Sequence, residues 1–155
     1  MTREKENSGF MDIAWETARG SNCRRKKVGA VVARAGTVLV SASNGTPEGM
    51  TPCNEGGCLR CSSPASRGTQ YDACVCVHAE QSVIARAART GVRIEGAILY
   101  CTLRPCLTCA KLCLESGIAR IIYAEDVRFA SDVEEAYKQL VRMTGLSITE
   151  YFEVM

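Results

Sequence analysis

The sequence is poor in several features that other classes of protein need. Its 155 residues include one histidine, four prolines and 6% aromatic residues, and the formal net charge is only +2. Few aromatic side chains and no strong positive charge argue against a nucleic-acid-binding protein. No apolar run approaches the length of a membrane span, and residues 1–7 mix charges without an apolar segment behind them. We therefore expect a cytoplasmic protein with no signal peptide, no membrane contact and no nucleic-acid partner.

The length and the apolar content of 46% fit one domain over residues 1–155. Apolar positions at helical spacing predict helices at residues 10–19, 78–90, 106–116 and 131–143. Runs of β-branched residues predict strands at residues 28–33, 37–43, 97–102, 120–124 and 146–152. This order of elements predicts an α/β fold, a three-layer α/β/α sandwich with a mixed five-stranded sheet.

Three local features refine this expectation. Ala35 and Gly36 lie between the first two strands and predict a hairpin turn. Ser131 followed by an acidic residue three positions later is typical of a capping box at the start of the last helix. Met11 and Trp15 share one face of the first helix, which predicts that both belong to the core.

The sequence contains ten cysteines, and most of them fall into groups. Six lie in or near a cysteine-rich insertion at about residues 50–76: Cys23, Cys53, Cys58, Cys61, Cys74 and Cys76. The insertion has no clear periodicity, and a segment of this length is unusual in a compact domain unless function or a metal organises it. In a reducing compartment such groups are typical of metal sites rather than disulfides. We expect Cys101 and Cys113, which fall in a strand and a helix, to be core residues.

The single histidine belongs to a second pattern. His78 precedes Glu80 by two positions, and Cys106 follows a proline and precedes Cys109 by three positions. An imidazole and two thiolates suit zinc, and three protein ligands leave the fourth tetrahedral position for water. Both segments lie at predicted helix starts, where the helix dipole stabilises a thiolate. The pattern is typical of zinc deaminases, in which the spare carboxylate, here Glu80, carries protons.

Two simpler interpretations compete with a catalytic zinc. A lone histidine is often an ordinary core or surface residue, and a proline followed by a Cys-x-x-Cys pair can be a redox pair or chance. Each half of the pattern is weak evidence alone. The two halves together, each at a helix start, favour the zinc site.

The sequence resembles the cytidine and deoxycytidylate deaminase superfamily and, within it, the deoxycytidylate (dCMP) deaminases. The superfamily shares the two metal-binding motifs, and the Asn-Gly-x-Pro-x-Gly loop and the cysteine-rich insertion point to dCMP. The matching segments are residues 27–32, 44–49, 53–61, 76–81, 105–110 and 116–118. The resemblance implies zinc-dependent hydrolytic deamination of dCMP to dUMP, with release of ammonia, in a cytidine deaminase-like fold.

The resemblance also implies roles for other residues. Asn44 would hydrogen-bond the sugar hydroxyl, Gly45 would allow the chain to approach closely, and the backbone of Ala79 would help to hold the base. Arg89 lies where some relatives carry an arginine linked to the nucleotide response. Relatives are commonly hexamers, activated by dCTP with Mg²⁺ and inhibited by dTTP. We therefore expect an allosteric homo-oligomer, a hexamer or a dimer.

The resemblance further implies a structural zinc in the insertion. Cys23 and Cys53 match positions that hold this zinc in phage relatives, and Cys76 matches a third position that those relatives fill with a carboxylate. The fourth ligand is one of the remaining three cysteines of the group. Six candidates for four places leave open one zinc with spare thiols or two metals that share thiolates, and some of these thiols can also be plain buried residues.

Other functions stay open. Ser82 stands where relatives usually have asparagine, so CMP, a 5-substituted dCMP or guanine is an alternative substrate. Deamination of adenosine in tRNA is disfavoured by the near-neutral charge, and a non-catalytic zinc-stapled module is disfavoured by Glu80. The basic run at residues 24–27 is either a solvated face or a phosphate contact, with Lys27 as the candidate.

Overall fold

Five strands form one mixed sheet in the computed structural model, which describes residues 3–66 and 68–152. The strands lie in the order β2-β1-β3-β4-β5. β1 pairs antiparallel with β2 and β3, whereas β3–β4 and β4–β5 are parallel pairs, so the predicted mixed sheet is confirmed. The bounds are β1 Gly29–Arg34, β2 Thr37–Ser43, β3 Ile98–Leu103, β4 Arg120–Glu125 and β5 Ser147–Glu150.

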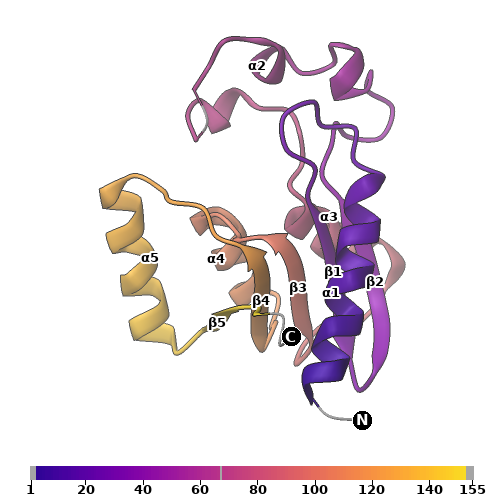
Figure 1. Ribbon diagram of the computed structural model, residues 1–155, viewed down its shortest axis with the longest axis vertical. Coiled ribbons are helices and arrows are strands. Elements are labelled where there is room, and N and C mark those ends of the chain that lie inside the picture. Colours follow the sequence, from indigo (N-terminus) through magenta and orange to yellow (C-terminus); the bar gives the residue numbers. More distant parts are fainter. Residues whose placement is uncertain (1–2, 67, 153–155) are drawn as a thin grey trace.

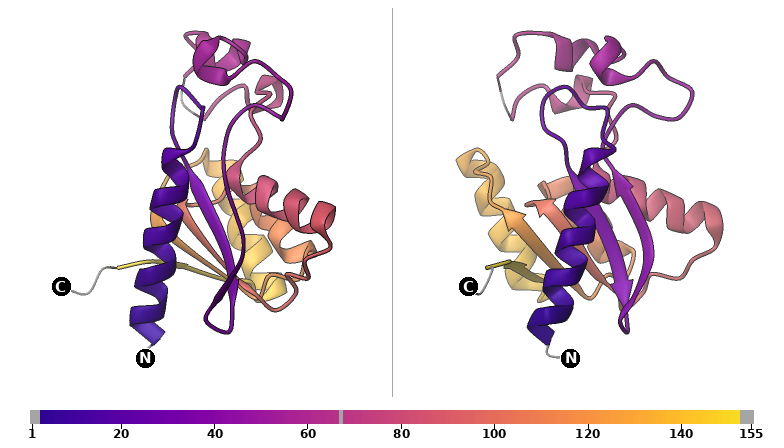
Figure 2. Two further views of the ribbon diagram at one scale, coloured as in Figure 1. Left: turned by 90° about the vertical axis from the view of Figure 1, so that its right-hand side faces the viewer. Right: turned by 45° about the vertical axis from the view of Figure 1, so that its right-hand side comes forward.

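Helices cover both faces of this sheet (Figures 1 and 2). Figure 2 shows α1 (Arg3–Arg19) on one face and three helices on the other: α3 (Ala79–Thr90), α4 (Leu107–Glu115) and α5 (Ser131–Thr144). The predicted three-layer α/β/α sandwich is therefore confirmed. A short helix, α2 (Leu59–Ser62), lies outside these layers in the insertion.

The central strands are buried on both faces, and alternate residues serve the two layers. Val31, Tyr100 and Ile122 form one row across β1, β3 and β4 and pack toward Met11 of α1. The neighbouring row belongs to the larger core beneath α3, α4 and α5 and consists of Val32, Leu99 and Ile121. The core thus lies on both sides of the sheet and fixes its register.

Two glycine-dependent features hold the first strand in place. Ala35 (φ 51°) and Gly36 (φ 77°) join β1 to β2 in left-handed conformation, as a two-residue hairpin turn of type I′ requires, which confirms the predicted turn. A Cβ atom at Gly29 would lie 2.0 Å from the carbonyl oxygen of Ala14. Only glycine at this position lets α1 pack so close to β1.

Three local predictions differ from the structure. α1 begins at Arg3 rather than residue 10, because its first residues are good helix formers that carry no apolar stripe. Trp15 is 37% exposed, so its predicted core position is wrong, whereas Met11 is buried as expected. The predicted capping box is also wrong: α5 is preceded by Ala130 and has no side-chain cap. The acidic residue of that box, Glu134, accepts hydrogen bonds elsewhere, from the backbone N–H of Phe129 and from an arginine.

The insertion forms a lobe beyond one end of the sheet, at the top of Figure 1. Although its sequence shows no clear periodicity, the insertion contains α2 and two short 3-10 turns, Cys53–Glu55 and Tyr71–Ala73. The assignment of residues 1–155 to one domain stays a prediction, since residues 1–2, 67 and 153–155 lie outside the described part.

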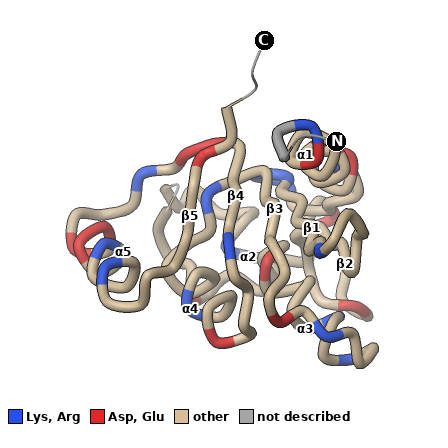
Figure 3. The backbone as a smooth tube through the Cα atoms, turned by 90° about the horizontal axis from the view of Figure 1, so that it is seen from below, with Lys and Arg blue, Asp and Glu red and all other residues tan. Residues whose placement is uncertain are grey.

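Within the described ranges, no helix is both long enough and apolar enough to cross a bilayer. Figure 3 shows the positions of Lys and Arg scattered among those of Asp and Glu. This mixture agrees with the small net charge of +2.

Candidate active site

The three predicted zinc ligands come together beside the end of β3. The Nδ1 atom of His78 lies 3.6 Å from Sγ of Cys106 and 3.3 Å from Sγ of Cys109. Zinc bonds of ~2.0–2.1 Å to nitrogen and ~2.3 Å to sulfur, at tetrahedral angles, would separate such atoms by about 3.6 Å. The donor set and its spacing therefore fit a zinc ion.

Both ligand segments begin helices, as the sequence predicts. His78 is the N-cap of α3, and its backbone N–H donates to Oε1 of Gln81 at 3.0 Å. Cys106 is the N-cap of α4, directly after Pro105. Contact with Cys109, and then with His78, lowers the pKa of the Cys106 thiol to about 4 in spite of burial. The thiolate is the form that binds a metal.

Glu80 lies beside these ligands in the first turn of α3. Its residue is only 4% exposed, and burial raises the pKa of its carboxyl group above the ordinary value. The thiol of Cys101, which is buried as predicted, hydrogen-bonds the Glu80 side chain. A buried carboxyl group whose pKa is raised above its ordinary value is a stronger base than an exposed one, and it can accept and return protons during a reaction.

His78, Glu80 and Cys106 line a cavity of about 390 Å³, within the usual range for small-molecule sites of ~300–1,000 Å³. His78, Ala79, Glu80 and Cys106 form one part of its wall. Asn44, from the loop after β2, also lines it. The cavity is therefore built where helix starts meet the end of a parallel strand, a common place for ligands in α/β folds.

The insertion supplies a wall that sequence reasoning missed. The ring of Tyr71 meets the imidazole of His78 edge to face, with centroids 5.9 Å apart. The guanidinium of Arg60 stacks on the Tyr71 ring, 5.0 Å from its centroid, and donates a hydrogen bond to the carbonyl of Thr69 at 2.7 Å. A lone tyrosine in an insertion without periodicity carried no signal for this contact.

A second missed group supports α4, the helix that carries the predicted zinc ligand Cys109, from the side of α5. Arg104 forms a double hydrogen bond with the Glu134 carboxylate, at 2.9 and 3.0 Å, and stacks 4.4 Å from the Tyr137 ring centroid. The Tyr137 hydroxyl donates to the carbonyl of Pro105 at 3.1 Å. These contacts hold the segment that carries Cys106.

The side-chain amide of Asn44 is largely engaged in holding neighbouring backbone. Its Oδ1 accepts from the Val28 N–H at 2.8 Å and the Ser21 hydroxyl at 2.7 Å, and its Nδ2 donates to the Lys26 carbonyl at 2.9 Å. An amide has two N–H donors, and these bonds use one of them. A cavity-lining Asn44 thus retains a donor for a ligand.

The other residues predicted to contact substrate or effector do not line the cavity. Gly45 is paired with Val77 through backbone bonds of 3.2 and 2.8 Å and lies outside the cavity lining. Lys27 is exposed and does not line the cavity, whereas its neighbours Arg25 and Lys26 do. Arg89 lies on the surface, where it forms an ion pair of 2.9 Å with Glu48.

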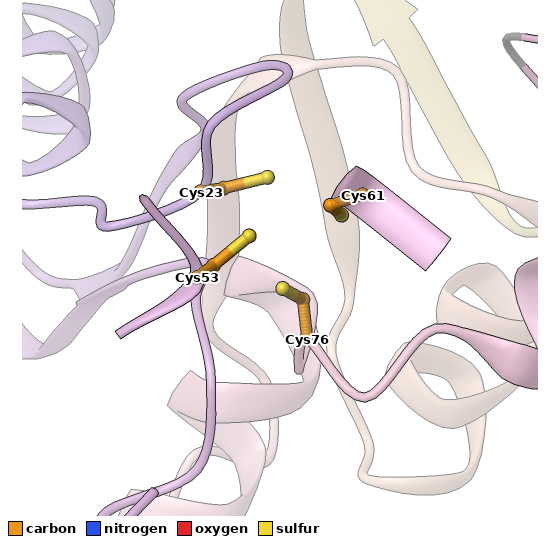
Figure 4. Close-up of side chains that lie close together, drawn as sticks. All are labelled: Cys23, Cys53, Cys61 and Cys76. Atoms are coloured by element: carbon orange, nitrogen blue, oxygen red, sulfur yellow. The ribbon is translucent and has the colours of Figure 1, made fainter. Parts of the chain in front are cut away.

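The six cysteines of the insertion group also come together. Figure 4 shows four of their side chains, from separate segments, converging on one small volume. This first set consists of Cys23, Cys53, Cys61 and Cys76, and a second set consists of Cys58, Cys61, Cys74 and Cys76. Within each set, all sulfur atoms lie within 4.8 Å of one another. These are donor sets that suit zinc.

The chain is similar in sequence to a protein-family model and to several named proteins. Residues 4–125 match the cytidine and deoxycytidylate deaminase zinc-binding region. The deoxycytidylate deaminase of Schizosaccharomyces pombe is 38% identical over 149 residues, which cover 96% of this chain and 45% of that protein. The chain spans about half the length of its yeast relatives. The deoxycytidylate deaminase of Mycobacterium phage D29 is 37% identical over 131 residues, which cover 81% of this chain and 99% of the phage protein.

The fold is also similar to that of a solved deaminase structure. The dCMP deaminase of the cyanophage S-TIM5, in complex with dCMP and dUMP, has a TM-score of 0.73 and 28% identity, with 97% of this chain and 99% of that chain covered. The match of the family model to most of the chain, together with a buried glutamate beside a histidine–cysteine metal site, shows that this chain belongs to the cytidine and deoxycytidylate deaminase family.

Proposed function

We propose that this protein catalyses the hydrolytic deamination of dCMP to dUMP, with release of ammonia. One observation carries the proposal: His78, Cys106 and Cys109 converge at the wall of a cavity in which the nearly buried Glu80 is the neighbouring carboxyl group. The names of the relatives support dCMP as the substrate.

Glu80 is the proton carrier in this proposal. A zinc ion bound by the three ligands would supply an activated water molecule. Glu80 accepts a proton from that water and passes one to the ring nitrogen next to the amino-bearing carbon. The same carboxyl group then helps ammonia to leave, so that an amino group is exchanged for an oxygen and one water is consumed. Burial of Glu80 keeps this proton away from bulk solvent.

Other residues hold the nucleotide. The free donor of Asn44 can reach a sugar hydroxyl, and the backbone of Ala79, which is fully buried at the cavity wall, can hold the base. Arg25 and Lys26 line the cavity, so we propose them, rather than Lys27, for contact with the phosphate.

We also propose a structural zinc among the six cysteines of the insertion group. The homo-oligomer, the cytoplasmic location, regulation by nucleotides with Mg²⁺ through Arg89, and the role of Gly45 in close approach to the substrate stay predictions.

Ammonia release from a substrate panel tests the proposal. Zinc-loaded protein is offered dCMP, CMP, deoxycytidine, 5-substituted dCMP, guanine and tRNA. We expect dCMP to be the preferred substrate. Arg25→Ala should raise KM for dCMP by ~10–150-fold, the loss expected for one hydrogen bond to a charged group, and should change deoxycytidine turnover little because that substrate has no phosphate. Activity on another member of the panel and none on dCMP would show that dCMP is not the substrate. Zinc-bound protein that releases no ammonia from any member would contradict the proposal.

A further inference from the structure

The cysteines of the insertion form an interior without aliphatic side chains. The buried cluster in this lobe consists of Cys23, Cys53, Cys58, Cys61 and Cys76, with Cys74 packed against it. The large aliphatic residues of the same lobe are exposed: Leu59 is 85% exposed, and Met50 and Val75 are also exposed. A lobe of this size that buries thiols and exposes its aliphatic side chains lacks a hydrophobic core, and such units usually depend on a metal or disulfides.

Disulfides do not take that role in this structure, because the ten cysteines are all free. The sulfur atoms are instead arranged as two overlapping sets of four. Cys61 and Cys76 belong to both sets. Two tetrahedral sites that share two thiolates need six cysteines, and the chain supplies six here.

Two sulfur–sulfur distances in the second set fit a tetrahedral site. Sγ of Cys74 lies 3.8 Å from Sγ of Cys58 and 3.8 Å from Sγ of Cys61. Zinc–sulfur bonds of ~2.3 Å at tetrahedral angles separate two ligand atoms by about 3.8 Å. Two sulfur–sulfur distances in the second set therefore already have the length expected for a zinc site.

A backbone N–H group contacts one sulfur atom of the second set. Cys58 is the N-cap of α2, and its sulfur accepts a hydrogen bond from the N–H of Cys61 at 3.5 Å. Side chains nearby add positive charge, since Arg25 donates to the carbonyl of Cys61 at 3.3 Å. Hydrogen bonds of this kind commonly surround metal-bound sulfur.

We propose that the insertion holds two zinc ions in one cluster, in which Cys61 and Cys76 bridge the ions while Cys23 and Cys53 complete one site and Cys58 and Cys74 the other. The six thiols lose their protons to solvent as the two ions bind. Six thiolates and two zinc ions leave a net charge of −2, which lies beside Arg25. The inference goes beyond the single structural zinc proposed above and does not depend on the deaminase activity.

The cluster would join three parts of the chain near the active site. Cys23 lies in the segment after α1, four cysteines belong to the insertion, and Cys76 is two residues before His78. The same insertion carries Tyr71, whose ring contacts His78. We therefore expect the two-zinc cluster to fix the wall of the cavity.

Elemental analysis of the full chain, purified with its metals, tests the cluster. We expect three zinc ions per chain: one in the histidine–cysteine site and two in the cluster. Cys74→Ser removes a terminal ligand of the second ion only, so the count should fall from three to two. The matched control Cys113→Ser changes a buried thiol outside the group and should leave three.

X-ray absorption at the zinc edge provides a readout that needs no variant. Two ions joined by shared thiolates give a zinc–zinc scattering contribution, whereas isolated sites do not. Three zinc ions per chain with this contribution is the expected result. Two zinc ions per chain, three without a zinc–zinc contribution, or iron in place of zinc would each overturn the two-zinc cluster.

Discussion

The two candidate metal-binding regions of this protein are built in opposite ways. His78 and Cys106 are held by helices that pack on a continuous hydrophobic core, so the fold makes their site. The cysteines of the insertion are themselves the buried interior of their lobe, with exposed aliphatic residues around them. We therefore expect the histidine–cysteine site to keep its arrangement without metal, whereas the insertion should need metal to remain ordered.

Removal of the catalytic histidine tests the first half of this comparison and should have the largest effect. His78→Ala deletes one zinc ligand, and the loss of metal-assisted water activation should lower kcat/KM for dCMP by more than ~10³-fold. Protection of insertion amides away from Tyr71, at residues 53–62, should change by less than about twofold in hydrogen exchange, because sites that share no contact usually act separately. Hydrogen exchange with mass spectrometry would check this, and a collapse of the insertion would contradict it.

Cys53→Ser tests the other half. It removes a fully buried member of the first sulfur set. Amide protection in residues 50–76 should fall by ~tenfold or more, about 1.4 kcal/mol of local stability, while β3 should keep its protection. Cys113→Ser again serves as the control, since its thiol lies in the main core. An equal loss of protection across the sheet and the insertion would contradict the proposed independence.

Tyr71→Ala links the two regions and should have a smaller effect. It removes the aromatic edge that meets His78. Aromatic pairs contribute about 0.5–1.5 kcal/mol, so kcat/KM should fall by ~2–10-fold. Tyr71→Phe keeps the ring and should restore most of the activity. A Phe variant as impaired as the Ala variant would assign the effect to the hydroxyl group instead.

Much of this architecture could be predicted from the sequence. The alternation of strands and helices predicted the three layers. The spacing of His78, Glu80, Cys106 and Cys109 predicted a site, and the structure brings these residues together. These predictions succeed because hydrophobic period and helix-start chemistry are local properties.

The missed features depend on long-range packing. The sequence holds no signal that Tyr71 would reach His78 or that Glu134 would pair with Arg104, 30 residues away, rather than cap its own helix. Trp15 has the spacing of a core residue, yet the buried face of α1 runs through Met11, Ala14 and Ala18 and leaves it at the margin.

The Glu134–Arg104 pair leads to the smallest predicted effect. Hydrogen bonds from Arg104, and then from the Phe129 N–H, lower the pKa of the Glu134 carboxyl group. A lowered pKa stabilises the folded state above the ordinary value near 4.5, and this stability is lost as pH falls through the lowered pKa.

Glu134→Gln should therefore cost about 1–2 kcal/mol of unfolding free energy at pH 7, and the difference from wild type should shrink toward pH 4. Glu135→Gln, at a side chain that is 73% exposed, is the matched control and should change stability little. Urea unfolding at several pH values measures both. A difference that is constant with pH would show that the charge of Glu134 is not responsible.

Glu80 gives the most direct test of the central claim, which is that this cavity deaminates dCMP. Ammonia release from dCMP would be measured for zinc-loaded wild type and Glu80→Gln, with zinc content determined for both. We expect wild-type protein to release one ammonia per dUMP formed, and the variant to keep its zinc but turn over ~10²–10⁴-fold more slowly. Equal rates in the two proteins would contradict the assignment of Glu80 and of the cavity as the active site.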